Sequence, residues 1–255
     1  MPSSLTGTTA LVTGASSGIG PATARRLAAL GATVAVVARR RDPLNALATE
    51  IEQAGGTAIV VVADISVRDQ AEAAVQQIAE LPGRLDIVVN NAGLMLLGPV
   101  VGADVEEWER MIAINQKALL YITNAALPYL LKAAEDEPRG VADIVNISSH
   151  AGRQTWANFG VYSMTKFGAH GFTEALRQEL TKRKVRVGLL EPGAVATELI
   201  SHNNEKIRAD LAASHAENIP VPLQPEDIAD SVAFMVTRPR HSSIAELGAM
   251  PTSQA

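Results

Sequence analysis

The apolar positions of this chain fall into short runs rich in β-branched residues, and such runs predict strands. Two of them, Val34–Val37 and Ile59–Val62, are apolar throughout instead of alternating with polar residues. Continuous apolar strands are typical of a parallel sheet covered on both faces. The predicted strands are Thr9–Thr13, Thr33–Ala38, Ala58–Ala63, Leu85–Val89, Asp143–Ser148 and Val185–Leu190.

Longer segments with helical spacing separate these strands, and Gly31 and Gly55-Gly56 are plausible helix stops. The alternation predicts an α/β fold, a doubly wound parallel sheet in a three-layer α/β/α sandwich. No linker or repeat divides the chain, so we expect a single domain over 1–255. We expect a charged turn at 135–140 and an irregular, lid-like segment at 197–222. The predicted helices are Ala22–Leu30, Leu44–Ala54, Gln70–Leu81, Glu106–Lys132, Ser163–Leu180 and Glu226–Val236.

Composition and charge narrow the classes of function. The 255 residues carry 22 Lys and Arg against 27 Asp and Glu, a net charge of −5, and the cations are scattered, so a nucleic-acid partner is not expected. The absence of cysteine excludes disulfides and thiolate-bound metals. The five histidines lack ligand spacing, so no metal is expected. We see no signal peptide or membrane span and expect a cytoplasmic protein.

A glycine-rich turn follows the first predicted strand and leads directly into a helix. Its residues are Gly14, Ala15, Ser16, Ser17, Gly18, Ile19 and Gly20. Glycines permit a tight turn and a close approach of the backbone to a pyrophosphate, whose charge is met by free N–H groups at the helix N-terminus. Alternatively, the segment is a strand–helix corner that binds nothing.

The end of the second predicted strand carries cations where a dinucleotide-binding fold often has a carboxylate for the ribose 2′-hydroxyl. Arg39, Arg40 and Arg41 follow Ala38. An Arg contact to a 2′-phosphate contributes about 1.5–3 kcal/mol, so we expect NADP to be preferred over NAD. The alternative is a solvated basic turn. Asp64 is placed to accept a hydrogen bond from adenine, or to cap a helix.

The glycine turn also matches the G-x-S-x-G nucleophile elbow of hydrolases, with Ser16 as nucleophile. Such an elbow needs earlier strands to supply part of the oxyanion hole, whereas one predicted strand precedes Ser16. No later histidine lies in an evident triad setting. A serine hydrolase is therefore the remote alternative.

Tyr162 and Lys166 stand four residues apart in a predicted helix, which places them on one face with Cβ atoms about 5–6 Å apart. A phenol of pKa about 10 is a poor acid–base catalyst near neutrality unless a cation favours its ionised form. Asn91 and Ser149 follow other strands, whose carboxyl ends share an edge with the glycine turn. We expect these groups to converge there.

With these motifs together, the chain resembles the short-chain dehydrogenase/reductase family from Thr13 to about Pro192. The resemblance implies a Rossmann fold, an NADP(H)-dependent oxidoreductase and the interconversion of a carbonyl and an alcohol substrate. Tyr162 would exchange the proton, Lys166 would hold the nicotinamide ribose and lower the tyrosine pKa, Ser149 would orient the carbonyl, and Asn115 would hold a relay water. A cofactor sensor without turnover is the alternative. The family's cofactor contacts match Gly14, Ser16, Ser17, Gly18, Ile19, Gly20, Arg39, Arg40, Asp64, Ile65, Asn91, Ala92, Gly93, Pro192, Gly193, Val195 and Thr197.

A closer likeness, carried by 91–100, by Trp108 and by 251–254, is to clavulanic acid dehydrogenase and the serine-type hydroxy-acid dehydrogenases. The tail before Pro251 departs from that group because it lacks a basic residue, so the relative's substrate does not transfer. The resemblance also implies a homo-oligomer, commonly a tetramer. For the substrate pocket we expect Met95, His150, Gln154, Phe159 and Ala194, with plain core packing as the alternative for Met95 and Phe159.

Overall fold

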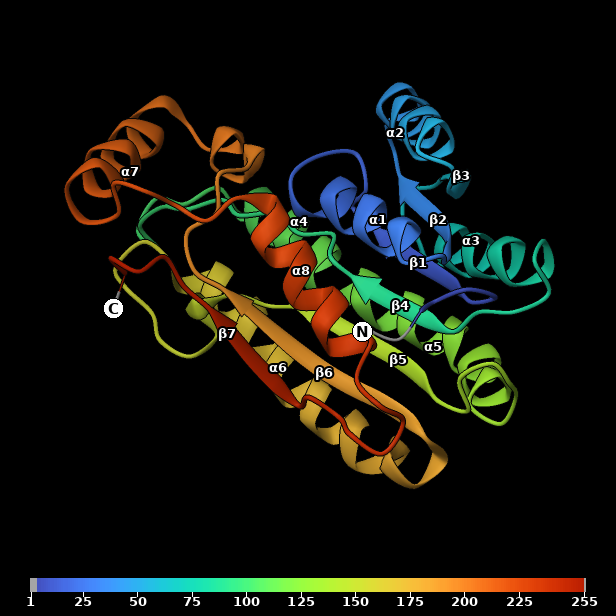
Figure 1. Ribbon diagram of the computed structural model, residues 1–255. Helices are drawn as coiled ribbons and strands as arrows, with labels where there is room; N and C mark the ends of the chain where they lie inside the picture. The colour runs from blue at the N-terminus through green and yellow to red at the C-terminus, as the bar shows by residue number, and fades with distance from the viewer. Residues whose placement is uncertain (1–3, 255) are drawn as a thin grey trace.

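The computed structural model describes residues 4–254 and contains a seven-stranded, wholly parallel sheet in the order β3-β2-β1-β4-β5-β6-β7. This is the predicted doubly wound, Rossmann-like α/β fold (Figure 1). The strand order reverses between β1 and β4, which is where such sheets bind ligands, at the carboxyl ends of the strands. The strands are β1 (Thr9–Thr13), β2 (Thr33–Ala38), β3 (Thr57–Val62), β4 (Ile87–Asn90), β5 (Ala142–Ile147), β6 (Val185–Pro192) and β7 (Glu246–Ala249).

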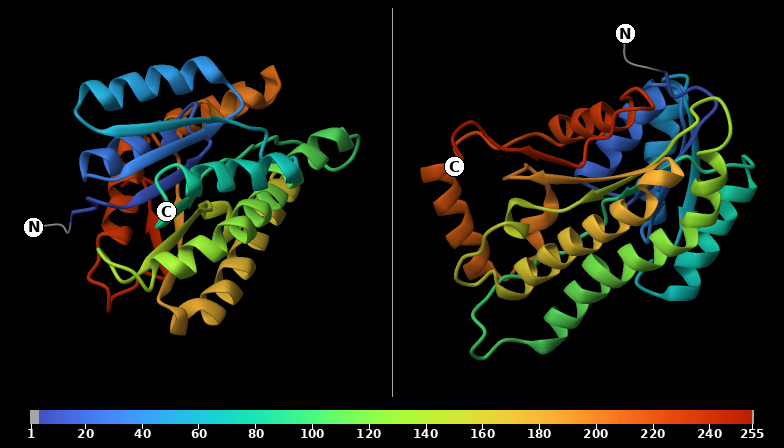
Figure 2. Two further views of the ribbon diagram at one scale, coloured as in Figure 1. Left: turned by 90° about the vertical axis from the view of Figure 1, so that its right-hand side faces the viewer. Right: turned by 90° about the horizontal axis from the view of Figure 1, so that it is seen from below.

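Helices cover both faces of the sheet, as the continuous apolar strands predict (Figures 1 and 2). One apolar core joins the sheet to α3, α5 and α6, and the other joins it to α1, α2 and α8. The helices are α1 (Ile19–Ala29), α2 (Arg41–Gln53), α3 (Arg68–Glu80), α4 (Val105–Ile112), α5 (Ala118–Ala133), α6 (Gly160–Leu180), α7 (Glu205–Asn218) and α8 (Pro225–Val236). Short 3₁₀ turns are η2 (His150–Gly152), η3 (Thr181–Arg183) and η4 (Glu198–His202).

Three elements differ from the sequence prediction. The expected helix Glu106–Lys132 is divided by a π-helical turn, η1 (Ala113–Lys117), between α4 and α5. The segment expected to be irregular contains η4 and α7. The edge strand β7 was not predicted, because it has only four residues and one of them is Gly248, a residue that is uncommon in strands.

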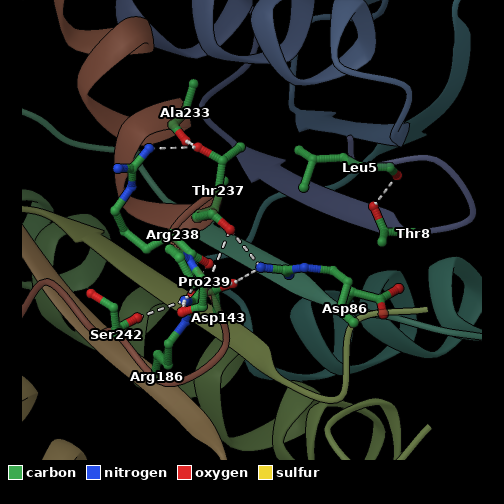
Figure 3. Close-up of polar contacts among 12 residues, drawn as sticks. Leu5, Thr8, Asp86, Asp143, Arg186, Ala233, Thr237, Arg238, Pro239 and Ser242 are labelled. Atoms are coloured by element: carbon green, nitrogen blue, oxygen red, sulfur yellow. Dashed lines mark hydrogen bonds and ion pairs between the residues drawn. The ribbon is translucent and has the colours of Figure 1, made fainter. Parts of the chain in front are cut away.

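A buried ionic cluster joins the amino ends of β5 and β6, at the edge of the sheet opposite the ligand-binding edge. Arg186 donates to both carboxylate oxygens of Asp143, at 2.7 and 2.9 Å, and Arg139 donates to Asp143 at 2.6 Å. Arg186 also donates to the carbonyl oxygen of Ser242 at 2.8 Å (Figure 3). Asp143 and Arg186 are both buried, and each compensates the charge of the other. Through its bond to Ser242, Arg186 also fixes the chain before β7 to the sheet.

Candidate active site

The glycine turn leads from β1 into α1 and leaves the helix N-terminus open. Gly18 is the N-cap residue, no side chain caps it within residues 4–254, and the first turn of α1 carries no acidic residue. Pro21 stands inside the first turn, where its missing N–H costs nothing. The free N–H groups and the helix dipole at Ile19 and Gly20 therefore suit an anion such as a pyrophosphate.

Close backbone packing in this turn requires glycine at two positions. Gly14 has φ +66°, and a Cβ there would lie 2.8 Å from Cα of Ala92. A Cβ on Gly20 would overlap the carbonyl group of Gly14. The backbone of this turn is thus packed too closely to admit a side chain at Gly14 or Gly20, as the sequence predicts for the tight turn of a dinucleotide site.

The loop after β4 is fixed to β1 by a set of hydrogen bonds. The side chain of Asn91 donates to the carbonyl oxygen of Thr13 at 2.9 Å, and the Thr13 hydroxyl accepts from the backbone N–H groups of Asn91 and Ala92 at 2.9 and 3.0 Å. Gly93, which follows, is close to Lys166 and Asn115. Asn91, Ala92 and Gly93 thus connect the glycine turn to the buried polar groups of the site.

Two arginines lie at the opening of the glycine turn, in different settings. Arg40 donates from Nη2 to the carbonyl oxygen of Ser16 at 3.1 Å and to its hydroxyl at 3.2 Å, and it contacts Glu198 at 3.4 Å. Arg39 is 70% exposed at its side chain and stands 3.9 Å from Asp64. Arg40 is therefore the guanidinium held at the turn, whereas Arg39 is exposed and faces Asp64.

Asp64 does not cap α3, whose N-cap is Val67 without a side-chain cap bond; its Oδ1 instead accepts from the backbone N–H and the hydroxyl of Ser66, at 3.0 and 2.6 Å. Its Oδ2 faces Arg39 and retains capacity to accept a further bond. The next residue, Ile65, is a buried core residue. The structure thus gives Asp64 a structural role beside the expected adenine contact.

Ser149, Tyr162 and Lys166 meet where β5 ends and α6 begins. Tyr162 and Lys166 are 5% and 7% exposed, and Nζ of Lys166 stands 5.8 Å from the centroid of the tyrosine ring. Nζ donates to the carbonyl oxygen of Ile147 at 3.1 Å. The Ser149 side chain is hydrogen-bonded to that of Tyr162 and accepts from the N–H of Ala151 at 3.1 Å. The predicted set is therefore assembled, with its side chains out of bulk water.

Burial dominates the protonation of this set. It raises the pKa of Tyr162 from 10.0 to about 12, against the opposing hydrogen bond from Ser149. It also lowers the pKa of Lys166 from 10.5 to about 8. The expectation that Lys166 lowers the tyrosine pKa is thus not met in the protein alone, because desolvation disfavours the charged form of both groups.

Asn115 lies in the π turn η1, and its side-chain bonds are internal. Its Oδ1 accepts from the N–H of Leu94, while Nδ2 donates to the carbonyl oxygen of Leu94, both at 2.8 Å, and to the hydroxyl of Thr165 at 3.0 Å. A cavity of about 10 Å³, close to the volume that one water needs, is lined in part by Asn90, Asn115 and Lys166. The side chain fits the reading of a buried, backbone-bonded asparagine, and the cavity would suit the expected water.

The segment after β6 returns to the glycine turn. Pro192 ends the strand, Gly193 packs against the tail, and the N–H of Ala194 donates to Oε1 of Gln254 at 2.8 Å. Val195 bridges to Leu223. The side chain of Thr197 lies beside Gly18 and caps η4. Of the expected cofactor residues in this segment, Thr197 thus lies beside the glycine turn, whereas Gly193 packs on the tail and Val195 pairs with Leu223. Gln254, which positions Ala194, has no local sequence signal.

The lid-like segment packs on the loop after β4 through apolar residues and one amide. Asn203 accepts from the N–H of Leu97 at 2.7 Å and donates to the carbonyl oxygen of Met95 at 2.9 Å. Leu199 and Ile207 share an apolar cluster with Met95 and Tyr162. Met95 is therefore core-packed, at 8% exposed, and its cluster forms one side of the expected pocket.

The other side of the pocket is a loop of aromatic residues. Phe159 is half-buried in the same cluster, and its ring lies beside that of Tyr162. Trp156, which sequence reasoning missed, lies between Phe159 and His150. His150 and Gln154 contact each other through their side chains. Met95 and Phe159 are thus beside Tyr162, whereas His150 and Gln154 lie further out, beside Trp156. Ala194 is oriented by the tail.

The family profile for short chain dehydrogenases matches residues 8–208. The chain belongs to the short-chain dehydrogenase/reductase family. An uncharacterized oxidoreductase of Staphylococcus epidermidis is 34% identical over 242 residues, which are 95% of this chain and 96% of that protein. A glycine betaine reductase of Emericella nidulans is 36% identical over 95% of this chain, which corresponds to 18% of that longer protein.

Solved structures of the family share the whole architecture. The closed form of serine dehydrogenase complexed with NADP⁺ has a TM-score of 0.86 and 34% identity, covering 97% of this chain and 96% of that one. A 3-ketoacyl-(acyl-carrier-protein) reductase from Brucella melitensis complexed with NADH has a TM-score of 0.85 and 30% identity, covering 99% and 100%. The chain is therefore an oxidoreductase that binds a nicotinamide dinucleotide, which removes the hydrolase alternative at Ser16.

A metal site and a membrane span were both expected to be absent. Within residues 4–254 no three His, Asp or Glu side chains are grouped as a metal site would require. In the same part of the chain no helix combines the length and the apolar character of a membrane span.

Proposed function

We propose that this protein is an NADP(H)-dependent reductase of aldehydes or ketones, which also catalyses the reverse oxidation of the alcohol. The observation that carries the proposal is the Ser149–Tyr162–Lys166 set, with Tyr162 and Lys166 buried, beside an open helix N-terminus at one edge of the sheet. Bound there, the nicotinamide cofactor would supply or accept the hydride. The tight turn at Gly14 and Gly20, where a Cβ would clash with the backbone, and the uncapped start of α1 fit its pyrophosphate.

The chain's own residues would carry the proton and the polar contacts. The hydroxyl of Tyr162 would give its proton to the substrate oxygen during reduction and take it back during oxidation. Ser149 would donate a hydrogen bond to the same oxygen and stabilise the developing alkoxide. Lys166, charged below its pKa of about 8, would hold the nicotinamide ribose and favour the ionised phenol as the proton leaves. A water in the cavity near Asn115 would return protons toward Lys166.

Three features support NADP(H) over NAD(H). Arg40 is held at the glycine turn by Ser16, Arg39 is exposed beside it, and β2 ends without a carboxylate. Both guanidinium groups offer charge-assisted bonds to a 2′-phosphate. The contact between Arg40 and Glu198 is exposed at 53% and 59%, and a surface pair of this kind contributes little, so it would yield to a phosphate.

Calorimetric titration of the cofactor-free protein with NADPH and with NADH tests the cofactor. We expect NADPH to bind at least tenfold more tightly. Arg40→Gln should lower that preference about tenfold, while Arg41→Gln, a matched loss of charge in the same turn, should change it less than twofold. Equal losses in both variants, or tighter binding of NADH, would contradict the assignment of Arg40.

Tyr162→Phe tests the chemistry. The variant should lose turnover of NADPH with aldehydes and ketones by at least a thousandfold, because no group would then transfer the proton, and its affinity for NADPH should stay within about threefold. Tyr121→Phe on α5 is the matched control and should keep full turnover. Near-normal turnover in Tyr162→Phe would remove the proton-transfer role. A wild-type protein that binds NADPH but reduces no carbonyl compound would favour the cofactor-sensor alternative.

We also propose that the protein is a homo-oligomer, with α5 and α6 in the interface. These helices run along one face of the molecule (Figure 2). Leu120 on α5 and Met164 and Phe167 on α6 are 42%, 49% and 46% exposed. Large apolar side chains on the outer surface of neighbouring helices are what a second copy would cover. Light scattering should give the mass of a tetramer, and Phe167→Glu should reduce it.

A further inference from the structure

Four rings stand in series from the proposed proton donor to the surface. The ring of Tyr162 lies 6.4 Å from that of Phe159, which lies 5.4 Å from Trp156, which lies 5.8 Å from His150. The first two of these contacts are edge-to-face arrangements, typical of favourable aromatic packing. The three outer residues belong to the loop between β5 and α6. We call this series of four rings the aromatic wall. It begins at Tyr162, the proposed proton donor.

Exposure increases along the aromatic wall from Tyr162 to Trp156, its most exposed ring, and His150 beyond it is half-buried. Tyr162 is buried, Phe159 is half-buried, and Trp156 is 46% exposed. A half-exposed indole retains apolar surface that another apolar group would cover. Because this surface is continuous with the phenol that would meet the carbonyl oxygen, a substrate bound there would lay its flank along Phe159 and Trp156.

The cations near the pocket are already paired or exposed. In the segments that surround Tyr162, namely 94–97, 150–161 and 199–203, the one Lys or Arg is Arg153. Arg153 is paired with the buried Glu191 of β6 and with Glu246 of β7. On α7, Ile207 is buried, whereas Lys206 and Arg208 are exposed.

Lys166 is also engaged, because it donates to the carbonyl oxygen of Ile147 and would hold the cofactor ribose. A substrate carboxylate next to the reacting carbon would therefore lose its water without gaining a counter-ion. The desolvation of an unpaired carboxylate is strongly unfavourable.

We infer that the preferred substrates are uncharged carbonyl compounds that carry an aromatic or similarly flat apolar group, and not hydroxy-acid or oxo-acid anions. The inference rests on the proposed reductase function. This preference would distinguish the chain from the structurally similar serine dehydrogenase, because serine carries a carboxylate. Trp156 is the specificity-determining residue, because it provides the most exposed ring of the aromatic wall.

Matched ketones and variants of Trp156 test the inference. Acetophenone and benzoylformate share a phenyl ketone and differ in a methyl group against a carboxylate, while acetone lacks the ring. We expect NADPH-dependent reduction of acetophenone with kcat/KM at least tenfold above that of benzoylformate. Trp156→Ala should lower kcat/KM for acetophenone about tenfold, mainly through KM, and change that for acetone less than twofold. Trp156→Phe should recover most of the loss.

The control is Phe234→Leu, which alters an exposed aromatic side chain on α8, on the other face of the sheet. It should leave both ketones within twofold of wild type. A preference for benzoylformate, or an equal loss for acetophenone and acetone in Trp156→Ala, would overturn the inference.

A binding measurement separates this inference from the proposed reaction. In Trp108→Phe, Trp156 is the sole indole, so its emission reports on the aromatic wall directly. With NADP⁺ present, 1-phenylethanol should change the emission saturably and L-serine should not. Saturation by L-serine alone would overturn the inference whether or not a ketone is reduced. If 1-phenylethanol saturates the signal but no ketone is turned over, the proposed reaction fails and the binding preference stands.

Discussion

The buried Lys166 should give the protein a characteristic dependence of stability on pH, and Lys166→Met should abolish it. The folded protein lowers the pKa of this ammonium from 10.5 to about 8 through burial alone. One pKa unit corresponds to about 1.4 kcal/mol, so the charged lysine destabilises the folded state by roughly 3 kcal/mol below pH 8. Its bond to the carbonyl oxygen of Ile147 at 3.1 Å offsets part of this cost.

The sign follows from counting protons. Between pH 8 and 10.5 the lysine is protonated in the unfolded chain but largely neutral in the folded protein. Because the unfolded state then binds more protons, the free energy of unfolding rises with pH. Tyr162 acts in the opposite direction only above pH 10, since its folded pKa is about 12. Burial lowers the pKa of the neighbouring His170 below 6.5, outside the same window.

Urea denaturation at pH 7.0 and pH 9.5 measures the effect. The wild type should gain about 2 kcal/mol between these values relative to Lys166→Met, which corresponds to the part of the window above pH 8. At pH 7 the variant should be as stable as the wild type or more so, although it has lost the catalytic ammonium. Lys182→Met, at an exposed position in η3, is the matched control and should follow the wild type. Parallel curves for wild type and Lys166→Met would refute the account of burial.

Three further substitutions probe other parts of the structure. Gly20→Ala would place a Cβ against the carbonyl group of Gly14, so the turn must open, and the calorimetric Kd for NADPH should rise at least tenfold in a protein with unchanged circular dichroism. Asn203→Ala removes the bonds between the lid-like segment and the loop after β4, so amide exchange over 198–218 should accelerate, with exchange in β1 unchanged. Asp143→Ala leaves Arg186 buried without its counter-ion, which should cost about 3–5 kcal/mol and lower Tm by roughly 6–20 °C, while the Kd for NADPH is unaffected at the far edge of the sheet.

The elements that the sequence predicts correctly are those whose buried residues form a regular local pattern of apolar positions. β2 lies in the sheet interior, and its apolar run predicts it fully. α7 was missed because its apolar residues do not gather on one face, and only Ile207 is buried. The π turn at 113–117 was missed because a change of helical register leaves no signal in an apolar period read over a long helix.

The same distinction holds for the site. The spacing of Tyr162 and Lys166 predicts that they share a helix face, and the strand ends predict that Asn91 and Ser149 come to the same edge. The pKa values depend on how far the helix is pressed into the sheet, so they could not be obtained from spacing. Two other features depend on the path of one loop: the pairing of Arg153 with Glu191 and the ring series through Trp156. A loop has no regular spacing of apolar residues from which that path could be predicted.

Chemistry and specificity are therefore held by different parts of the molecule. The proposed reacting groups Tyr162 and Lys166 lie on α6, where burial disfavours charge on both side chains. The expected selectivity lies on the loop that carries Trp156, which is tied to the sheet through Arg153 and is exposed over 153–158. Substitutions in 150–159 should thus be enough to change the preferred substrate. Replacing Tyr162 or Lys166, in contrast, would change stability and turnover together.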